Sequence, residues 1–122
     1  MNLSERNTIE SALLIYIDVD SFHKNDRLEE GFEEFYSLVK SSGLVVKEST
    51  RFKQKAPITS TFITSGKLEI LKDTILSTEI DLIIVNHQLS ASQNRNLENF
   101  FNKRVIDKTE LILDIFASVS YT

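Results

Sequence analysis

The sequence predicts an α/β fold: a single three-layer domain with a mostly parallel sheet of four to five strands and helices on both faces. Short apolar segments rich in β-branched residues alternate with longer segments whose apolar residues recur every three or four positions. The 122 residues, 41% of them apolar, are enough for one buried core. Because no repeat or low-complexity tract divides the chain, we expect one domain.

The first strand and the first helix have clear signals. Residues 13–19, LLIYIDV, form a nearly continuous apolar run, which is typical of a strand buried on both faces. Residues 26–42 carry apolar residues at helical spacing after the acidic Asp26, so we expect a helix there. Gly43 is a suitable left-handed C-cap and predicts the end of that helix.

The next part of the chain predicts two strands separated by a loop. Residues 44–50 form the second strand, and residues 51–61, which hold the only proline and several basic side chains, form a long basic loop. Residues 61–64 predict a short third strand. Ser65-Gly66 then turns into a helix that ends near Glu79. The predicted buried face of this helix consists of Leu68, Leu71 and Ile75.

The last third of the chain repeats the alternation of strand and helix. Residues 81–85, DLIIV, are the least ambiguous strand. Ser90 is a suitable N-cap for the helix that follows, with Gln93 three residues on as in a capping box. Residues 104–107 predict a brief strand, and a last helix begins in the segment LILDIFASVSY, residues 111–121.

Composition argues against several classes of protein. The chain contains no cysteine and only two histidines, which excludes disulfides and thiolate chemistry and argues against a zinc site. No segment approaches the roughly 18 consecutive apolar residues of a membrane span, and the N-terminus lacks a basic leader followed by an apolar region. We therefore expect a cytoplasmic protein without a membrane span.

The charge is unevenly distributed. The net charge is −4 and the sequence pI is about 5.2, which argues against a domain that binds nucleic acid through bulk positive charge. A local basic cluster nevertheless exists, with four positive residues against one negative residue over nine positions: Lys47, Arg51, Lys53 and Lys55 against Glu48. This cluster is a candidate contact with an anionic partner.

The sequence lacks the usual motifs for nucleotide or covalent chemistry. The three glycines, Gly31, Gly43 and Gly66, are scattered, so no glycine loop is available to hold phosphates. The two histidines, His23 and His87, form no triad or metal constellation by spacing, and His87, just after a strand, suits a polar contact. We therefore assign no catalytic residue, no cofactor and no enzymatic activity to this chain.

An alternative chemistry centres on Asp18 and Asp20, because carboxylates at the carboxyl end of a central strand can hold a divalent metal. The segment around them resembles the DxDxF element of diguanylate cyclases and the first metal motif of Y-family polymerases. The GG(D/E)EF turn that completes the cyclase site has no counterpart downstream. A fragment of a metal-dependent nucleotide enzyme is kept as an alternative, beside an interpretation in which both residues cap the strand and its loop.

Three segments in fixed order carry a family resemblance. They are FITSGKLE at residues 62–69, NHQLSASQNRNLE at residues 86–98 and VIDKTELILDIFA at residues 105–117. These segments resemble the N-terminal domain of HflX-type ribosome-associated GTPases, a branch of the Obg-related translational GTPases. The last is close to that family's VIDRTxLILDIFAxRA, with Lys108 in place of arginine. With weaker upstream matches, the similarity covers about residues 12–117.

This resemblance implies that residues 1–122 form an N-terminal α/β domain. The α/β unit would occupy about residues 12–110, and residues 111–122 would begin the helix that leads to a helical hairpin and a G domain. The parent is then a GTP-binding protein that binds the large ribosomal subunit, through rRNA and protein, and acts in ribosome splitting or rescue. Its GTP and Mg²⁺ belong to the G domain, so this chain is expected to be a docking or regulatory domain without GTPase activity.

Two sets of residues are candidates for contacts under this resemblance. The first, for contacts with RNA or with the parent protein's other domains, comprises Lys47, Arg51, Lys53, Lys55, Lys67, Gln93, Asn94 and Arg95. The second is a joint between the sheet and the last helix and comprises Asp107, Lys108, Thr109 and Asp114. Thr109 is the expected cap of that helix, with Asp107 and Lys108 pairing locally.

Two further expectations concern ligands and association. A regulatory small-molecule module, with ATP as the candidate ligand at the strand ends, is the third functional alternative. Ile112, Ile115 and Phe116 are expected to form an apolar patch on the last helix that is open to dimerisation.

Overall fold

Strands and helices alternate along the chain in the computed structural model, which describes residues 9–22 and 28–120. The strands are β1 (Ser11–Val19), β2 (Val45–Gln54), β3 (Leu82–Val85) and β4 (Arg104–Ile106). The helices are α1 (Leu28–Ser41), α2 (Ser65–Ser77), α3 (Ala91–Phe101) and α4 (Lys108–Ser120). One turn of 3₁₀ helix, η2 (Asp20–Phe22), follows β1.

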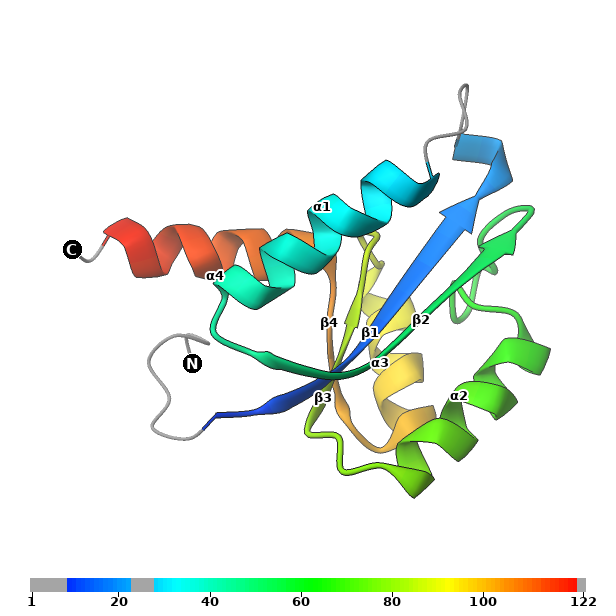
Figure 1. Cartoon of the computed structure of the whole chain (residues 1–122). Helices are drawn as coiled ribbons and strands as arrows, with labels where there is room; N and C mark the ends of the chain where they lie inside the picture. Colours follow the sequence, from blue (N-terminus) through cyan, green and yellow to red (C-terminus); the bar gives the residue numbers. More distant parts are fainter. Residues whose placement is uncertain (1–8, 23–27, 121–122) are drawn as a thin grey trace.

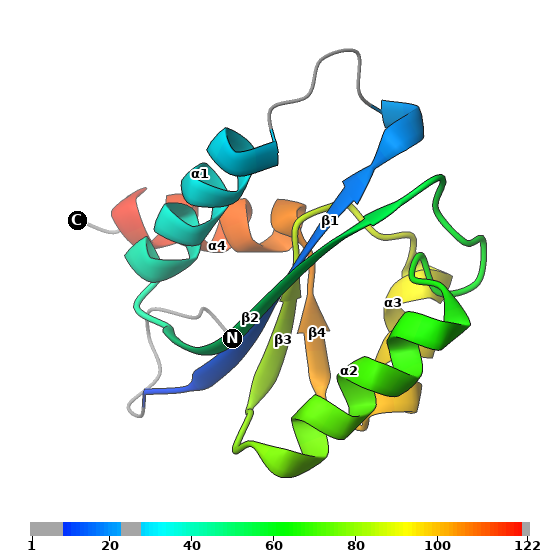
Figure 2. The ribbon, with the colours of Figure 1, turned by 45° about the vertical axis from the view of Figure 1, so that its right-hand side comes forward.

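The four strands form one parallel sheet in the order β2-β1-β3-β4 (Figure 1). Helices α1 and α4 cover one face, and α2 and α3 cover the other (Figure 2). The predicted three-layer α/β domain is therefore confirmed. Because β1 connects through α1 to β2 on one side and β3 connects through α3 to β4 on the other, the winding of the chain reverses between β1 and β3.

Strand β1 is buried on both faces, as its apolar sequence predicts. Alternate side chains of a strand point to opposite faces of the sheet. Leu13, Ile15 and Ile17 enter the core under α2 and α3, whereas Leu14 and Tyr16 enter the core under α1 and α4. The helices on both faces are what keep this strand away from water.

The predicted buried face of α2 and the predicted cap of α3 are confirmed. Leu68, Leu71 and Ile75 are buried on α2. At the start of α3, the Ser90 hydroxyl accepts a hydrogen bond from the Gln93 backbone N–H (3.1 Å), and Gln93 Oε1 accepts one from the Ser90 N–H (2.9 Å). This reciprocal pair is the predicted capping box.

The predicted helix ends are close to the observed ones. Helix α1 ends at Ser41, and Gly43 follows with a φ of 89°, so the predicted left-handed residue is confirmed. Helix α2 ends at Ser77, shortly before the predicted Glu79. The predicted start of α1 at Asp26 lies outside the described residues. None of the helices in the described ranges is long and apolar enough to cross a membrane.

Two predictions between residues 51 and 64 are wrong. Strand β2 continues to Gln54, because pairing with β1 along its length outweighs the weak strand preference of the charged side chains. Residues 61–64 form no strand in the described structure; an isolated antiparallel bridge joins Ile58 and Phe62 instead. Phe62 has a φ of 69°, a backbone conformation that a strand does not accept.

Helix α4 begins at Lys108, earlier than the segment that predicted it. Leu111 is buried and anchors the helix to the sheet. Ile112 and Phe116 are 43% and 70% exposed, whereas Ile115 packs against the core. The predicted apolar patch is thus present on α4, although Ile115 is turned inward and Leu113, 63% exposed, takes part instead.

Candidate docking surface and helix joint

The outer strand β2 carries most of the basic cluster. Its register with β1 places Arg51 and Lys53 on the face that carries α1, and Phe52 on the face that carries α2. Lys47 lies in the same strand, and Lys55 directly follows it. The charged side chains are exposed, which suits a strand at the edge of a sheet.

Two of the basic side chains lie over aromatic rings. The Arg51 guanidinium carbon is 4.6 Å from the centroid of the Phe32 ring, and Lys67 Nζ is 4.9 Å from the centroid of the Phe52 ring. Such cation–π contacts contribute about 0.5–1 kcal/mol at exposed sites. Lys67, in the first turn of α2, therefore joins the cluster on β2. We call the set the basic edge; it comprises Lys47, Arg51, Lys53, Lys55 and Lys67.

The polar residues at the start of α3 have internal partners. Gln93 Nε2 donates to the Ile58 carbonyl (3.0 Å), and Asn94 Nδ2 donates to the Val105 carbonyl (3.0 Å). Arg95 is exposed. Gln93 and Asn94 thus hold the fold together, and the role of these three residues in an outside contact stays a prediction.

Gln54 organises the connection between β2 and α2, a role that sequence reasoning missed. Its Nε2 donates to the carbonyls of Ala56 (2.8 Å) and Phe62 (2.7 Å), and its Oε1 accepts from the Thr64 N–H (3.2 Å). The side chain is buried, so these bonds satisfy an amide that water does not reach. A single glutamine in a charged segment carries no specific signal for this role.

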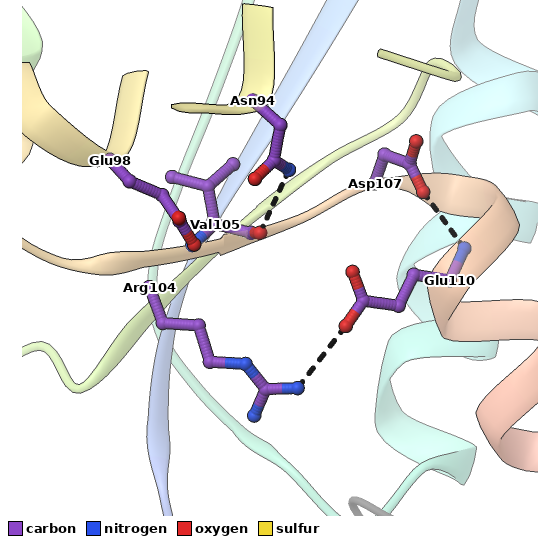
Figure 3. A network of polar contacts seen from close by, with 6 residues as sticks. All are labelled: Asn94, Glu98, Arg104, Val105, Asp107 and Glu110. Carbon is purple, nitrogen blue, oxygen red and sulfur yellow. Dashed lines mark hydrogen bonds and ion pairs between the residues drawn. The ribbon is translucent and has the colours of Figure 1, made fainter. Parts of the chain in front are cut away.

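Asp107 joins β4 to α4 and to the connection between β3 and α3. Its Oδ1 accepts from the Glu110 N–H (2.8 Å; Figure 3), and its Oδ2 accepts from the Leu89 N–H (2.9 Å). Asp107 is therefore the N-cap of α4, in place of the predicted Thr109, because the helix begins at Lys108 and leaves Thr109 inside its first turn. Within the described residues, Asp107 and Lys108 form no ion pair, and both carboxylate oxygens accept from backbone amides.

Further polar contacts fix β4 between α3 and α4 (Figure 3). The Val105 N–H donates to Glu98 Oε2 (2.9 Å), and the carbonyl of the same residue accepts from Asn94. Arg104 Nη2 lies 3.2 Å from Glu110 Oε2, in an ion pair that is about half exposed and so contributes little. These contacts connect the two helices through the strand.

An open groove of about 510 Å³ runs beside α4. It is lined by Asp107, Thr109 and Asp114, together with Leu113. The structure thus brings three of the four predicted joint residues together. Lys108, the fourth, lines a different cavity.

The two acidic residues of the metal alternative lie at the carboxyl end of β1. Asp18 is buried, whereas Asp20 is exposed in η2. Among the residues that the structure describes, no three His, Cys, Asp or Glu side chains gather in a way that could hold a metal ion. The metal alternative stays a prediction, and His23 lies outside the described residues.

His87 makes the polar contact that its position predicts. Its Nε2 lies 2.6 Å from the Ile17 carbonyl oxygen and carries the proton, because a carbonyl can only accept; its ring stacks on Phe62 with centroids 4.9 Å apart. The preceding Asn86 pairs with the same residue: Oδ1 accepts from the Ile17 N–H (2.7 Å), and Nδ2 donates to its carbonyl (3.1 Å). These side chains extend the pairing of β1 and β3 beyond the end of β3.

The geometry defines a class of protein first: a parallel α/β domain with a charged outer strand and a capped last helix that leads away from the sheet. Comparison with known proteins gives the family. A family model described as "GTP-binding GTPase N-terminal" matches residues 29–117. The GTPase HflX of Escherichia coli (strain K12) is 36% identical over 113 residues, which are 93% of this chain and 26% of that protein. The GTPase HflX of Alkalihalophilus pseudofirmus is 39% identical over 115 residues, with the same shares of each chain.

Solved structures agree with the sequence relatives. The crystal structure of a GTP-binding protein from the hyperthermophilic archaeon Sulfolobus solfataricus in complex with GDP matches with a TM-score of 0.63 and 26% identity. The match covers 89% of this chain and 30% of that chain. The chain belongs to the HflX family of GTPases and corresponds to their N-terminal domain. It spans about a quarter of the length of the curated relatives that it matches.

Proposed function

We propose that this domain docks an HflX-like GTP-binding protein on the large ribosomal subunit, where the protein acts in ribosome splitting or rescue. Family membership supports the kind of partner. The observation that carries the proposal is the basic edge, which gathers five cationic residues from β2, its end and α2 on a domain of net charge −4. A group of cations along one edge strand of an otherwise acidic domain suits a contact with rRNA phosphates along that edge.

The same proposal divides the work between this domain and the rest of the protein. GTP and Mg²⁺ would bind in the G domain, and this domain would have a docking or regulatory role without GTPase activity. The joint residues Asp107, Lys108, Thr109 and Asp114 would set the direction in which α4 leads to the helical hairpin and the G domain. The cytoplasm, where ribosomes work, is the proposed location.

Cosedimentation with purified large ribosomal subunits across a salt series tests the docking role. The variant that combines Lys47→Gln, Lys53→Gln and Lys55→Gln removes three charges of the basic edge but leaves Arg51 on its aromatic ring. The wild-type chain should bind at low salt and lose affinity as salt rises. In a plot of log affinity against log salt concentration, the slope for the variant should be smaller in magnitude by about 2. Each lost phosphate contact reduces this slope by roughly 0.7.

A charge-matched control separates the basic edge from net charge. Lys40→Gln, Lys72→Gln and Lys103→Gln together remove three positive charges outside the basic edge, so this variant should bind like the wild type. Equal losses in both variants would show that net charge alone governs binding. No binding of the folded wild-type chain at low salt would leave ribosome contact to other domains, with this one as a scaffold or regulator.

A further inference from the structure

A cavity of about 470 Å³ opens where the carboxyl ends of β1 and β3 meet. It lies where the connections of these two strands leave in opposite directions, the position at which open parallel sheets bind ligands. Its volume falls within the range of about 300–1,000 Å³ that is typical of small-molecule sites. The residues of its wall that matter here are Tyr16, Phe22, Gly31, Glu34, His87 and Lys108.

Tyr16 supplies a polar group that the protein itself does not use. The residue is only 7% exposed, and its ring packs against Phe32 and Phe35 with centroids 5.6 and 6.3 Å away. Within the described chain its hydroxyl forms no hydrogen bond, although it lines the cavity. The hydroxyl keeps some exposure at the cavity wall, where a ligand atom can pair with it in place of water. A bound molecule could supply that partner.

Two charged side chains reach the cavity from different elements. Glu34 comes from α1, and Lys108 is the first residue of α4. Among the described residues, neither side chain takes part in an ion pair or a hydrogen bond. The cavity therefore offers one cation, one anion and one neutral hydroxyl, each available to a ligand.

Aromatic side chains form the apolar part of the wall. Phe22 is 56% exposed, and its ring meets the His87 ring edge to face with centroids 5.6 Å apart. Large exposed aromatic rings beside a cavity are suited to a flat, apolar molecule.

We propose that this cavity binds a small planar aromatic molecule that carries one anionic group. Lys108 holds the anion, the Tyr16 hydroxyl and the Glu34 carboxylate hold polar substituents of the ring, and Phe22 contacts its apolar surface. An aromatic carboxylate and a nucleoside monophosphate share this chemistry. The inference does not depend on ribosome docking, because none of these residues belongs to the basic edge and only Lys108 is shared with the proposed joint.

Titration of the chain with three probes, followed by the backbone amide NMR signals of Asn86 and His87, tests the proposal. Anthranilate carries a ring, a carboxylate and an amino group; AMP carries a ring system and a phosphate; aniline lacks an anionic group. At least one of the two anions should bind with a dissociation constant of about 1 mM or tighter. If anthranilate binds more tightly than AMP, aniline, which lacks the carboxylate, should bind about tenfold more weakly than anthranilate.

Variants connect the binding to the named side chains. Lys108→Met should weaken anion binding about tenfold, and Tyr16→Phe, which keeps the ring, about threefold to tenfold. Lys103→Met removes a lysine that does not line this cavity and should leave binding unchanged. Thermal unfolding of each variant confirms that it is folded.

Each outcome is decisive. Binding of AMP alone identifies a nucleotide as the source of the anion, and binding of anthranilate alone identifies a carboxylate; both results support the proposal. No shift of the Asn86 and His87 signals up to about 10 mM probe would overturn it. So would shifts confined to the exposed residues Leu113 and Phe116, or binding that Lys108→Met leaves unchanged.

Discussion

Gly31 gives α1 room to lie against β1, because a Cβ at this position would overlap with the Tyr16 hydroxyl. We expect Gly31→Ala to lower the free energy of unfolding by about 1–2 kcal/mol. The cost of the overlap should exceed the gain of about 1 kcal/mol that alanine brings to a helix. Urea unfolding followed by circular dichroism measures the change.

Gly66→Ala is the matched control. Gly66 also lies in a helix, but an added Cβ there would have no atom within 4 Å, so this variant should be up to about 1 kcal/mol more stable than the wild type. Gly31→Ala should also cost less in a Tyr16→Phe background. Equal stability of the two single alanine variants would mean that Tyr16 moves aside without cost.

Tyr16 makes stability depend on pH in the alkaline range. Burial, and then the negative charge of Asp18, raises the pKa of Tyr16 above its ordinary value of 10.0. The folded chain therefore holds this proton more tightly than the unfolded chain. The resulting stability is fully present below pH 10 and is lost as the pH rises through the pKa of the folded state.

The free energy of unfolding should thus fall more steeply above pH 10 in the wild type than in Tyr16→Phe. Denaturant titrations at a series of pH values measure both slopes. Parallel curves for the two proteins would show that the Tyr16 proton is not linked to folding.

At the scale of elements, the Asp107 carboxylate links α4 to the connection between β3 and α3. Asp107→Ala removes two hydrogen bonds to backbone amides and should lower the free energy of unfolding by about 2–3 kcal/mol. Thr109→Ala, at an exposed position of the same helix, should change it by less than about 0.5 kcal/mol. Urea unfolding of both variants measures the difference.

Hydrogen exchange shows whether the cap acts on both elements. In Asp107→Ala the amides of Leu89 and Glu110 should exchange faster than in the wild type, because each loses its acceptor. If Thr109→Ala lowers the free energy of unfolding more than Asp107→Ala does, Thr109 is the N-cap of α4, as the sequence predicts.

Elements with a strong internal pattern could be predicted from the sequence, and those fixed by distant contacts could not. The apolar β1 and the capped α3 carry their own signals. Arg51 and Lys53 indicated a loop, but an outer strand tolerates charge, so charge alone does not separate the two. Phe62 suits a strand by residue type, yet Gln54 and the stacked His87 ring hold it in a left-handed conformation.

The candidate sites divide in the same way. The basic edge and the joint are largely contiguous in sequence, so their residues could be named in advance. The cavity could not be built from sequence, because β1, η2, α1, the segment after β3 and α4 each contribute to it and only the strand order brings them together. Tyr16 itself looked like an ordinary residue of a buried strand.

At the scale of the whole molecule, the exposed side chains of α4 are expected to cause self-association. Leu113→Ser with Phe116→Ser should reduce any dimer seen in sedimentation velocity, with a stability change below about 1 kcal/mol because both residues are mostly exposed. Leu111→Ala, on the buried side of the same helix, should lower stability by about 2–5 kcal/mol without removing the patch. A wild-type chain that stays monomeric at high concentration would show that the exposed apolar side chains of α4 do not cause self-association.

The all-parallel sheet also sets the order in which the chain can fold. Strand β1 is synthesised first, but Asn86, at the end of its neighbour β3, lies 69 residues after the Ile17 amide that it binds. At about 5–20 residues per second, this central strand waits roughly 3–14 s for its second neighbour. In a hairpin, neighbouring strands follow each other closely in sequence, so the interval would be shorter. A parallel sheet contains no hairpins, because each pair of parallel strands needs a long crossover connection. We therefore expect the nascent domain to expose its most apolar strand for seconds, an interval in which aggregation competes with folding.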